Sequence, residues 1–243
     1  MNTLGLETTA LGFVAGFTGK AIEDGLAAQG IHTDFIHLPE GNSRINVKVK
    51  HGDETEINGQ GPVITEEAIN ELFAKLDTLT KEDILVLAGS IPNTLPEDIY
   101  EKILASLESK GIRIVVDATK DLLLNVLKYH PFLIKPNNHE LGEMFGIVCK
   151  TDEDIVHYAK KLQEKGAVNV LISMAGDGAI LITEDGQNIK MGTPKGKVVN
   201  SVGAGDSMVA GFITGYIRGG NYEEALKSGT AAGLSLIHIS EPT

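Results

Sequence analysis

The amino-acid sequence predicts an α/β protein built around a mostly parallel sheet. Short β-type runs alternate with amphipathic helical stretches along the chain, which is the pattern of βαβ units. Several of the β-type runs consist almost entirely of isoleucine, valine and leucine, as in "ILVLAG" and "IRIVVDA". Because such strands have no polar face, we expect helices on both faces of the sheet. The 243 residues suffice for one large domain of this kind.

The first elements along the chain are a strand, a helix and an alternating ribbon. We expect a strand in "TALGFVA" and a helix from Thr18 to Gln29. The segment "RINVKVK", Arg44 to Lys50, alternates strictly between polar and apolar residues. After the turn "HGDE" the chain returns in "TEIN", so this part predicts a half-exposed antiparallel ribbon instead of a core strand. We call it the β lid, at about residues 31–60.

The rest of the chain continues the alternation. The expected strands are Ile84–Gly89, "IRIVVDA", Phe132–Lys135, "VNVLIS" and the hairpin pair "GAILIT" and "QNIKMG". The expected helices are Pro96–Ser109, Asp121–Lys128, "HELGEMFG", Asp152–Lys165, Asp206–Arg218 and a last one from Tyr222 onward. Proline near the start of the first of these favours a helix there, and glycines at 146 and 166 are typical helix stops.

Charge and composition argue against several classes of function. The formal charge is −12 and no dense cluster of lysine and arginine is present, so we expect no nucleic-acid partner. A single cysteine, Cys149, excludes an internal disulfide framework and is typical of a reducing compartment, which predicts a cytoplasmic protein. No apolar run approaches the about 18 residues that a membrane span needs, and the first residues lack the pattern of a signal peptide. The seven histidines lack a zinc-binding spacing such as HExxH.

The stretch "NSVGAGDSMVAGF" places one carboxylate, Asp206, at the start of a helix that has almost no polar residue. A helix that is apolar all round is buried. Its first N–H groups have no partner within the helix, and the helix dipole is positive there. The residues Gly203, Ala204 and Gly205 allow backbone amides to point at a common centre. The pattern predicts an anion site, and a phosphate is its natural ligand.

Asp206 in this first turn has two interpretations. It is able to accept a proton from an attacking hydroxyl group beside the bound phosphate, because phosphoryl transfer depends mainly on positioning and charge stabilisation. Alternatively, it only caps the helix, since aspartate is common at helix starts and contributes about 1 kcal/mol there.

Two further stretches of similar character follow other expected strands. In "IKPNNHEL", Asn137 and Glu140 come just after a strand, where open α/β sheets bind ligands. The segment "SMAGDGA", Ser173 to Ala179, is a tight glycine-rich turn at another strand end. Taken singly, the first is a helix cap and the second an ordinary hairpin. Three such loops at one edge of a sheet predict a nucleotide site, although neither the G-x-G-x-x-G nor the Walker A pattern is present.

In combination, these stretches resemble the ribokinase/PfkB family of carbohydrate kinases. "NSVGAGDS" is similar to the family signature with the anion hole and the catalytic aspartate, "KPNNHE" to its N-x-x-E element and "SMAGDGA" to its ATP-binding turn. The resemblance extends from about Leu4 to Ser235. It implies a ribokinase-like three-layer α/β/α fold with a mostly parallel sheet and a small β lid. It also implies ATP and Mg²⁺ as cofactors and a small sugar phosphate as substrate.

The resemblance assigns one set of residues to phosphoryl transfer and nucleotide binding. Asp206 would take the proton of the sugar hydroxyl as catalytic base, and Lys135 would contact the phosphates of ATP. Asn137 and Glu140 would act on Mg²⁺ through water. The amides that would hold the moving phosphoryl group are those of Gly203, Ala204 and Gly205. The residues that would border the nucleotide are Ser173, Gly176, Asp177 and Gly178.

A second set would bind the sugar phosphate. Arg44 would hold the phosphate already present on the sugar, because its planar guanidinium bonds two oxygens at once. Ser90 and Asn46 would assist it. The alternative interpretation of Arg44 is a charge on a solvated ribbon face.

The substrate that the resemblance implies is fructose 1-phosphate. "SRINVKVK", "ETEING" and "LVLAGSIP" are similar to the family members that convert it to the 1,6-bisphosphate with ATP. Kinases of tagatose 6-phosphate or fructose 6-phosphate are alternatives within the family. A non-catalytic protein that binds a nucleotide or a sugar phosphate, or an inactive fragment, is an alternative of another class. Asp206 argues against it, because binding alone needs no base.

The resemblance also predicts the domain organisation. Family members open with a strand that has a sugar-binding aspartate and a G-G-K-G-x-N motif, and they end in helices over the adenine site. Neither feature is found here, so we expect residues 1–234 to form a ribokinase-like domain that is incomplete at both ends. The segment 235–243, "SLIHISEPT", resembles a translated sequencing adapter and is expected to be a non-native tail. We expect a homodimer through the apolar side of the β lid, formed by Ile45, Val47 and Val49.

Overall fold

The computed structural model of the protein describes residues 1–51, 53–89, 91–193 and 203–237, with the backbone alone for 48–51, 53–56 and 235–237. The chain divides into two compact units. We call residues 80–89 and 100–237 the large unit, and Asn2–Leu79 with Ile91–Ile99 the small unit. The predicted division at residue 234 stays a prediction. Among the described residues, no helix has the length and apolar character needed to cross a membrane.

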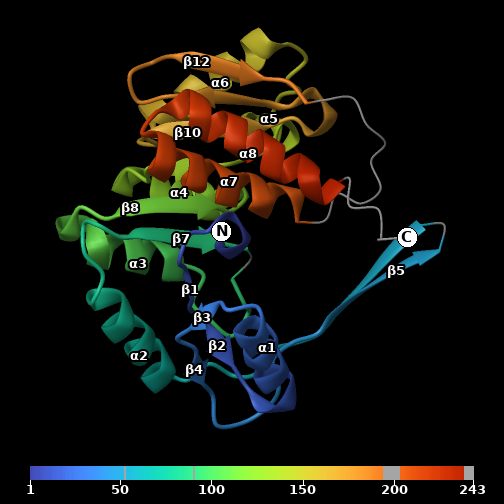
Figure 1. The fold of residues 1–243 in the computed structure, drawn as a ribbon, viewed down its shortest axis with the longest axis vertical. Helices are drawn as coiled ribbons and strands as arrows, with labels where there is room; N and C mark the ends of the chain where they lie inside the picture. The colour runs from blue at the N-terminus through green and yellow to red at the C-terminus, as the bar shows by residue number, and fades with distance from the viewer. Residues whose placement is uncertain (52, 90, 194–202, 238–243) are drawn as a thin grey trace. The chain divides into compact units, whose positions relative to one another are not determined.

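The large unit is built on a six-stranded mixed sheet, labelled in Figure 1. Its strands lie in the order β12-β11-β10-β9-β8-β7. The four parallel strands are β7 (Ile84–Ala88), β8 (Arg113–Asp117), β9 (Leu133–Ile134) and β10 (Asn169–Ser173). The two antiparallel strands at one edge are β11 (Ala179–Ile182) and β12 (Asn188–Met191). The predicted mostly parallel sheet is therefore confirmed.

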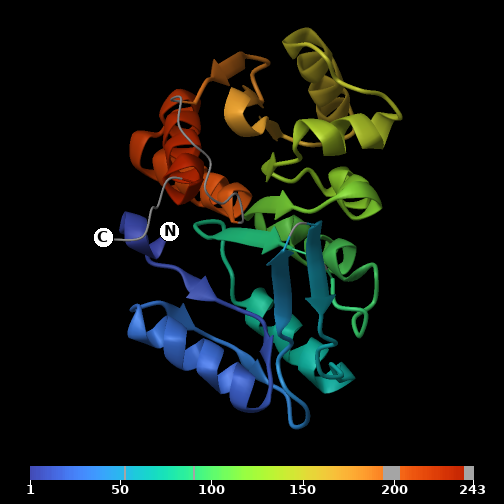
Figure 2. The ribbon, with the colours of Figure 1, turned by 90° about the vertical axis from the view of Figure 1, so that its right-hand side faces the viewer.

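Helices cover both faces of this sheet, as predicted from its apolar strands. The helices are α3 (Ile99–Leu107), α4 (Lys120–Val126), α5 (Asn138–Phe145), α6 (Asp152–Glu164), α7 (Ala204–Gly219) and α8 (Tyr222–Ile237). Short 3₁₀ turns lie at Glu108–Lys110, Leu127–Tyr129 and Ala175–Asp177. Figure 2 shows α7 and α8 on one face of the sheet and α5 and α6 on the other. Between these layers Val115, Leu133 and Leu171 are completely buried.

Helices α7 and α8 pack closely because glycines line their contact. A Cβ atom on Gly211 would lie 2.4 Å from the carbonyl oxygen of Ser228 and 2.6 Å from Cβ of Ala232. One on Gly215 would lie 2.6 Å from the carbonyl oxygen of Glu224. The predicted burial of α7 is confirmed as far as Gly215, while Ile217, near the end of the helix, is 52% exposed.

The small unit is made of short parallel strand pairs, an antiparallel hairpin and two α-helices. Its elements are η1 (Asn2–Leu4), β1 (Thr9–Ala10), β2 (Phe13–Val14), α1 (Gly16–Ala28), β3 (His32–Thr33), β4 (Ile36–His37), β5 (Asn46–His51), β6 (Asp53–Asn58) and α2 (Glu66–Asp77). The expected strand "TALGFVA" is divided into β1, which pairs with β3, and β2, which pairs with β4. Helix α2 was not predicted, although Thr65 accepts a hydrogen bond from the N–H of Ala68 as its N-cap.

Helix α1 starts at Gly16, two residues before the predicted position, because side chains from a later loop satisfy the N–H groups at its start. Asn42 Oδ1 accepts from the N–H of Phe17 at 3.2 Å, and Ser43 Oγ accepts from the N–H of Ala15 at 3.0 Å. Gly16 has φ +58°, and a Cβ there would lie 2.1 Å from Asn42 Oδ1. Glycine is needed at position 16 because a side chain there would collide with Asn42 Oδ1.

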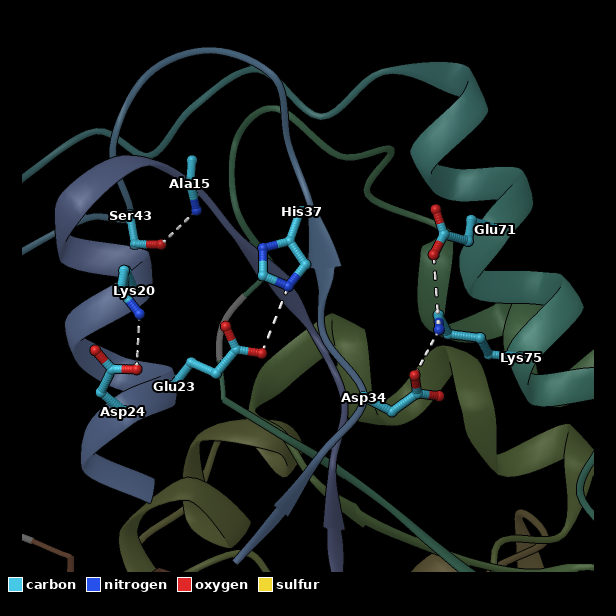
Figure 3. A network of polar contacts seen from close by, with 9 residues as sticks. All are labelled: Ala15, Lys20, Glu23, Asp24, Asp34, His37, Ser43, Glu71 and Lys75. Atoms are coloured by element: carbon cyan, nitrogen blue, oxygen red, sulfur yellow. Dashed lines mark hydrogen bonds and ion pairs between the residues drawn. The ribbon is translucent and has the colours of Figure 1, made fainter. Parts of the chain in front are cut away.

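Ion pairs join the elements of the small unit, as Figure 3 shows. Lys75 Nζ on α2 lies 2.6 Å from Asp34 Oδ1, between β3 and β4, and 3.6 Å from Glu71. His37 Nε2 on β4 lies 3.5 Å from Glu23 Oε1 on α1. These exposed pairs fix the packing of helices against the short strands more than they add stability.

The predicted antiparallel ribbon is confirmed as the hairpin of β5 and β6. Val47 pairs with Ile57 in its register. The exposed fractions of Ile45, Val47 and Ile57 are 58%, 46% and 61%. The side chain of Val49 is outside the described residues. Among the described part of the small unit, this hairpin therefore presents an apolar side to solvent.

We expect Gly211→Ala to destabilise the protein, because the added methyl group cannot fit between α7 and α8. Overpacking of this kind costs about 1–3 kcal/mol. The midpoint of thermal unfolding, followed by circular dichroism, should fall by several degrees.

Gly25→Ala on α1 is the matched control, since a Cβ there meets nothing within 4 Å. It should stabilise the protein by about 0.5–1 kcal/mol, because alanine loses less backbone freedom in a helix. A similar loss of stability in both variants would contradict the packing described for α7 and α8.

Candidate active site

The candidate site lies where the four parallel strands of the large unit end. β8 ends at Asp117, β9 leads directly into Lys135, and β10 ends at Ser173. Asn137 forms an isolated parallel bridge with Ser173, and the N–H of Ser173 donates to the carbonyl oxygen of Pro136 at 3.2 Å. The loops after β9 and β10 therefore run side by side, so the sheet brings together two of the three predicted loops.

Lys135 extends from this edge to the start of α7. It is only 6% exposed, and its Nζ lies 3.2 Å from Asp117 Oδ1. A Cβ on Gly205 would lie 3.1 Å from the same Nζ. Gly205 thus leaves the space that the ammonium group occupies, and the third predicted loop joins the other two through this contact.

The start of α7 has no side-chain cap. Its N-cap is Gly203, with φ +80°, a left-handed conformation that favours glycine. Because the N-cap has no side chain, the N–H groups of the first turn receive none of the bonding that serine or aspartate gives at this position. Asp206 lies in this first turn and is exposed, so it is not the N-cap residue that one alternative required. The helix start keeps the donors and the positive dipole that attract an anion.

The start of α5 is closed by a capping box. Asn137 Oδ1 accepts from the N–H groups of His139 and Glu140, at 2.9 and 2.8 Å. Glu140 Oε2 in return accepts from the N–H of Asn137 at 2.8 Å. The cap that the sequence allowed as an alternative is therefore present. It fixes the position of the Glu140 carboxylate and occupies one of its two oxygens.

Four charged groups influence one another in this part of the large unit. Burial raises the pKa of Asp117 above its ordinary value, and the ammonium group of Lys135 opposes this shift. The charges of Asp206 and Glu140 raise the pKa of Asp117 further. Two carboxylates and one ammonium group therefore lie within electrostatic reach of Asp117, and Asp206 among them belongs to the helix start that attracts anions. This combination of carboxylates, an ammonium group and a helix start favours the binding of an anion that is accompanied by a cation.

The glycine-rich turn after β10 has the tight geometry expected of "SMAGDGA". It contains the 3₁₀ turn Ala175–Asp177, and Ala175 has the unusual φ of +48° for a residue with a side chain. Gly178 has φ +94°, and a Cβ there would lie 1.9 Å from the carbonyl oxygen of Met191. Ser173 and Asp177 lie at the two ends of this turn, with Gly176 open to solvent within it. Only glycine fits position 178.

Sequence reasoning missed Asp117 and Tyr100. Asp117 had the same signal as Asn137, a polar residue at the carboxyl end of a buried strand. The Tyr100 hydroxyl donates to the carbonyl oxygen of Ala88, at 3.1 Å, with Gly89 O at 3.4 Å, at the end of β7. Burial raises the pKa of Tyr100, and the charge of Asp117 adds to this shift. No local pattern pointed to Tyr100, which in the sequence is one more residue of a helix.

Those residues predicted to bind the sugar phosphate that the structure describes lie outside the large unit. Arg44 and Asn46 belong to the small unit, at the start of the β5–β6 hairpin, and both are exposed. Ser90 is outside the described residues. Their assignment stays a prediction. Among the described residues, no group of three or more histidine, cysteine, aspartate and glutamate side chains is arranged to hold a metal ion.

Known proteins resemble this chain along almost its whole length. Residues 1–238 match the description "pfkB family carbohydrate kinase". A protein of Bacillus subtilis named 1-phosphofructokinase is 50% identical over 224 residues, which are 92% of this chain and 73% of the relative. A protein of Bacillus licheniformis named D-tagatose-1-phosphate kinase is 38% identical over 234 residues, 96% of this chain and 76% of the relative.

A solved structure has the same fold. The tetrameric inhibited form of phosphofructokinase-2 from Escherichia coli superposes with a TM-score of 0.86 at 25% identity, over 96% of this chain and 78% of that one. The fold, the site at the strand ends and these matches agree, and the chain belongs to the PfkB family of carbohydrate kinases.

Proposed function

We propose that the protein transfers the γ-phosphoryl group of ATP to D-fructose 1-phosphate and forms D-fructose 1,6-bisphosphate. The observation that supports this most directly is the start of α7, which has no side-chain cap, contains Asp206 in its first turn and meets the buried Lys135 at Gly205. The 50% identical relative named 1-phosphofructokinase supports the choice of sugar phosphate.

The chemistry follows from the placement of these groups. The amides of Gly203, Ala204 and Gly205 hold the transferring phosphoryl oxygens, because the helix start offers unpaired donors and positive potential. Asp206 accepts the proton of the attacking sugar hydroxyl. Lys135 balances the charge of the phosphates, which is the main task of a protein in phosphoryl transfer.

Mg²⁺ fits this site, although the described residues form no metal cage. Mg²⁺ keeps several of its waters and binds through one or two carboxylates together with substrate phosphates. Glu140 is fixed by the capping box with one carboxylate oxygen not used by the cap. Glu140, and Asn137 beside it, would hold the ion through water. When bound, the ion neutralises charge on the phosphates of ATP.

Nucleotide and sugar binding complete the proposal. The turn with Ser173, Gly176, Asp177 and Gly178 borders the nucleotide, since its strained backbone lies after β10 at the same sheet edge. Arg44, assisted by Asn46 and Ser90, binds the phosphate already on the sugar, because guanidinium matches phosphate oxygens in pairs. We place the reaction in the cytoplasm, where ATP and sugar phosphates are present.

A second substrate has support from one observation. The 38% identical relative is named D-tagatose-1-phosphate kinase, and tagatose 1-phosphate has its phosphate at the same end of the sugar as fructose 1-phosphate. Tagatose 6-phosphate and fructose 6-phosphate, with the phosphate at the other end, remain the more distant alternatives.

We expect the full-length protein to have its highest kcat/KM for fructose 1-phosphate, in an assay that couples ADP release to NADH oxidation. Asp206→Asn should lower kcat by at least about a hundredfold, because general bases contribute about 10²–10⁴. Glu223→Gln, in the first turn of α8, is the matched control and should leave kcat unchanged.

Three results would contradict these assignments. A higher kcat/KM for any of the other three sugar phosphates would replace the substrate. Turnover of Asp206→Asn within about tenfold of wild type, or only about 1.4 kcal/mol in the barrier, would remove Asp206 as base. Binding of ATP without any turnover would favour a non-catalytic protein.

Glu140→Gln separates the structural role of this residue from its proposed role with Mg²⁺. Glutamine also completes a capping box, so the midpoint of thermal unfolding should change little. The lost charge should lower kcat at least about tenfold and raise the Mg²⁺ concentration needed for half-maximal rate. An unchanged rate would show that Glu140 acts as a cap alone.

We also propose a homodimer through the apolar side of the β5–β6 hairpin. The exposed Val47 and Ile57, paired across the hairpin, support this, and the E. coli relative is named as a tetrameric form. Val47→Glu should shift the mass measured by analytical ultracentrifugation towards the monomer. Val63→Glu, at a residue that is 74% exposed and lies outside the hairpin, should not. A monomeric wild type at micromolar concentration would contradict the dimer.

A further inference from the structure

The position of Lys135 is electrostatically unfavourable by itself. Its ammonium group lies next to Gly205, in the first turn of α7, where the helix dipole is positive. Its side chain is almost completely buried, so water does not screen the repulsion or solvate the charge. A lysine in this place needs a negative partner to remain there before a phosphate arrives.

Asp117 is the ion-pair partner of Lys135 in the described structure, and its backbone is firmly held. Asp117 Oδ1 lies 3.2 Å from Lys135 Nζ. Asp117 is the last residue of β8, where it pairs with Ala88 of β7, and its carbonyl oxygen accepts from the N–H of Gly89 at 3.2 Å. The carboxylate is therefore attached to the rigid sheet instead of a loop. A group so attached fixes the direction of the lysine side chain.

The surroundings of Asp117 disfavour the negatively charged form of its carboxyl group. It is mostly buried, and two further carboxylates, Asp206 and Glu140, act on it with like charge. Burial raises its pKa, and Lys135 is the group that opposes the shift. A buried ion pair is often no more stable than an apolar pair of the same size, so stability alone does not explain this one. The position of the ion pair next to Gly205, at the start of α7, does explain it.

We propose that Asp117 is a positioning residue that holds the ammonium group of Lys135 in the space left by Gly205, where it meets the negative group bound at the start of α7. The proposal rests on the proposed function only in taking that negative group to be a phosphate of ATP. Asp117 itself touches neither the nucleotide nor the metal ion in this account. The effect of Asp117 on catalysis passes through Lys135.

A double-mutant cycle with Asp117→Asn and Lys135→Met tests this. The probes are ATP and fructose 1-phosphate in the coupled assay, and ATP alone in titration calorimetry with EDTA present. Asp117→Asn should raise KM for ATP, and Kd for ATP in EDTA, by about tenfold, while KM for fructose 1-phosphate changes less than twofold. In the Lys135→Met background, Asp117→Asn should change KM and Kd for ATP less than twofold.

The opposite results would overturn the proposal. An equal loss of ATP affinity from Asp117→Asn in the wild-type and Lys135→Met backgrounds would mean that Asp117 acts independently of Lys135. A loss of ATP affinity that is present with Mg²⁺ and absent in EDTA would mean that Asp117 acts on the metal ion. Equal rises in KM for both substrates would mean a general structural role.

Gly205→Ala provides a second test that removes no charge, and it decides the question if Asp117→Asn does not fold. Its methyl group would lie 3.1 Å from Lys135 Nζ, a contact tight enough that the ammonium group has to shift, while the amide of residue 205 remains. It should raise Kd for ATP in EDTA at least fivefold in the wild type and less than twofold in the Lys135→Met background. An unchanged Kd in the wild type would refute the positioning. Because these arms measure ATP binding, they remain valid if the sugar phosphate proves to be a different one.

Discussion

Parallel strand pairing is the constraint on which the large unit depends. Four neighbouring strands that run in the same direction, β7 to β10, must end at the same edge of the sheet. Two charged side chains lie at this edge, because Asp117 is the last residue of β8 and Lys135 directly follows β9. Since β8, β9 and β10 are mostly buried, the edge is where such side chains reach a ligand without loss of core packing. The candidate site is a consequence of this arrangement.

Glycines determine how closely the remaining parts approach that edge. Gly211 and Gly215 let α7 pack tightly on α8, and Gly205 lets Lys135 reach the start of α7. Gly203 starts the helix in a left-handed conformation without a side chain. Helix α7 is thereby packed tightly against α8, while its N-cap residue gives the first turn no side-chain hydrogen bond. An open, rigidly held helix start is what a phosphate site requires.

Much of this arrangement was predictable from local sequence. Local pattern located each strand of the large unit and each of its helices within a few residues, because continuous apolar runs mark buried strands and amphipathic stretches mark helices. In the small unit it located α1 and the alternating β5–β6 hairpin, but the strands of two residues are too short for any period, and α2 was missed despite its cap at Thr65. Helix α1 began earlier than expected because Asn42 and Ser43, from a distant loop, supply its first hydrogen bonds.

By itself, the sequence indicated the candidate side chains: Asp206 after three small residues, and Asn137 and Glu140 after a buried strand. Residue type and spacing along one element are sufficient for that, because they encode neighbours a few positions apart. Only the tertiary structure decided that Lys135 lies between Asp117 and Gly205, and that Tyr100 holds the end of β7. These contacts join different elements, and their partners depend on strand order and helix packing, which no local pattern contains.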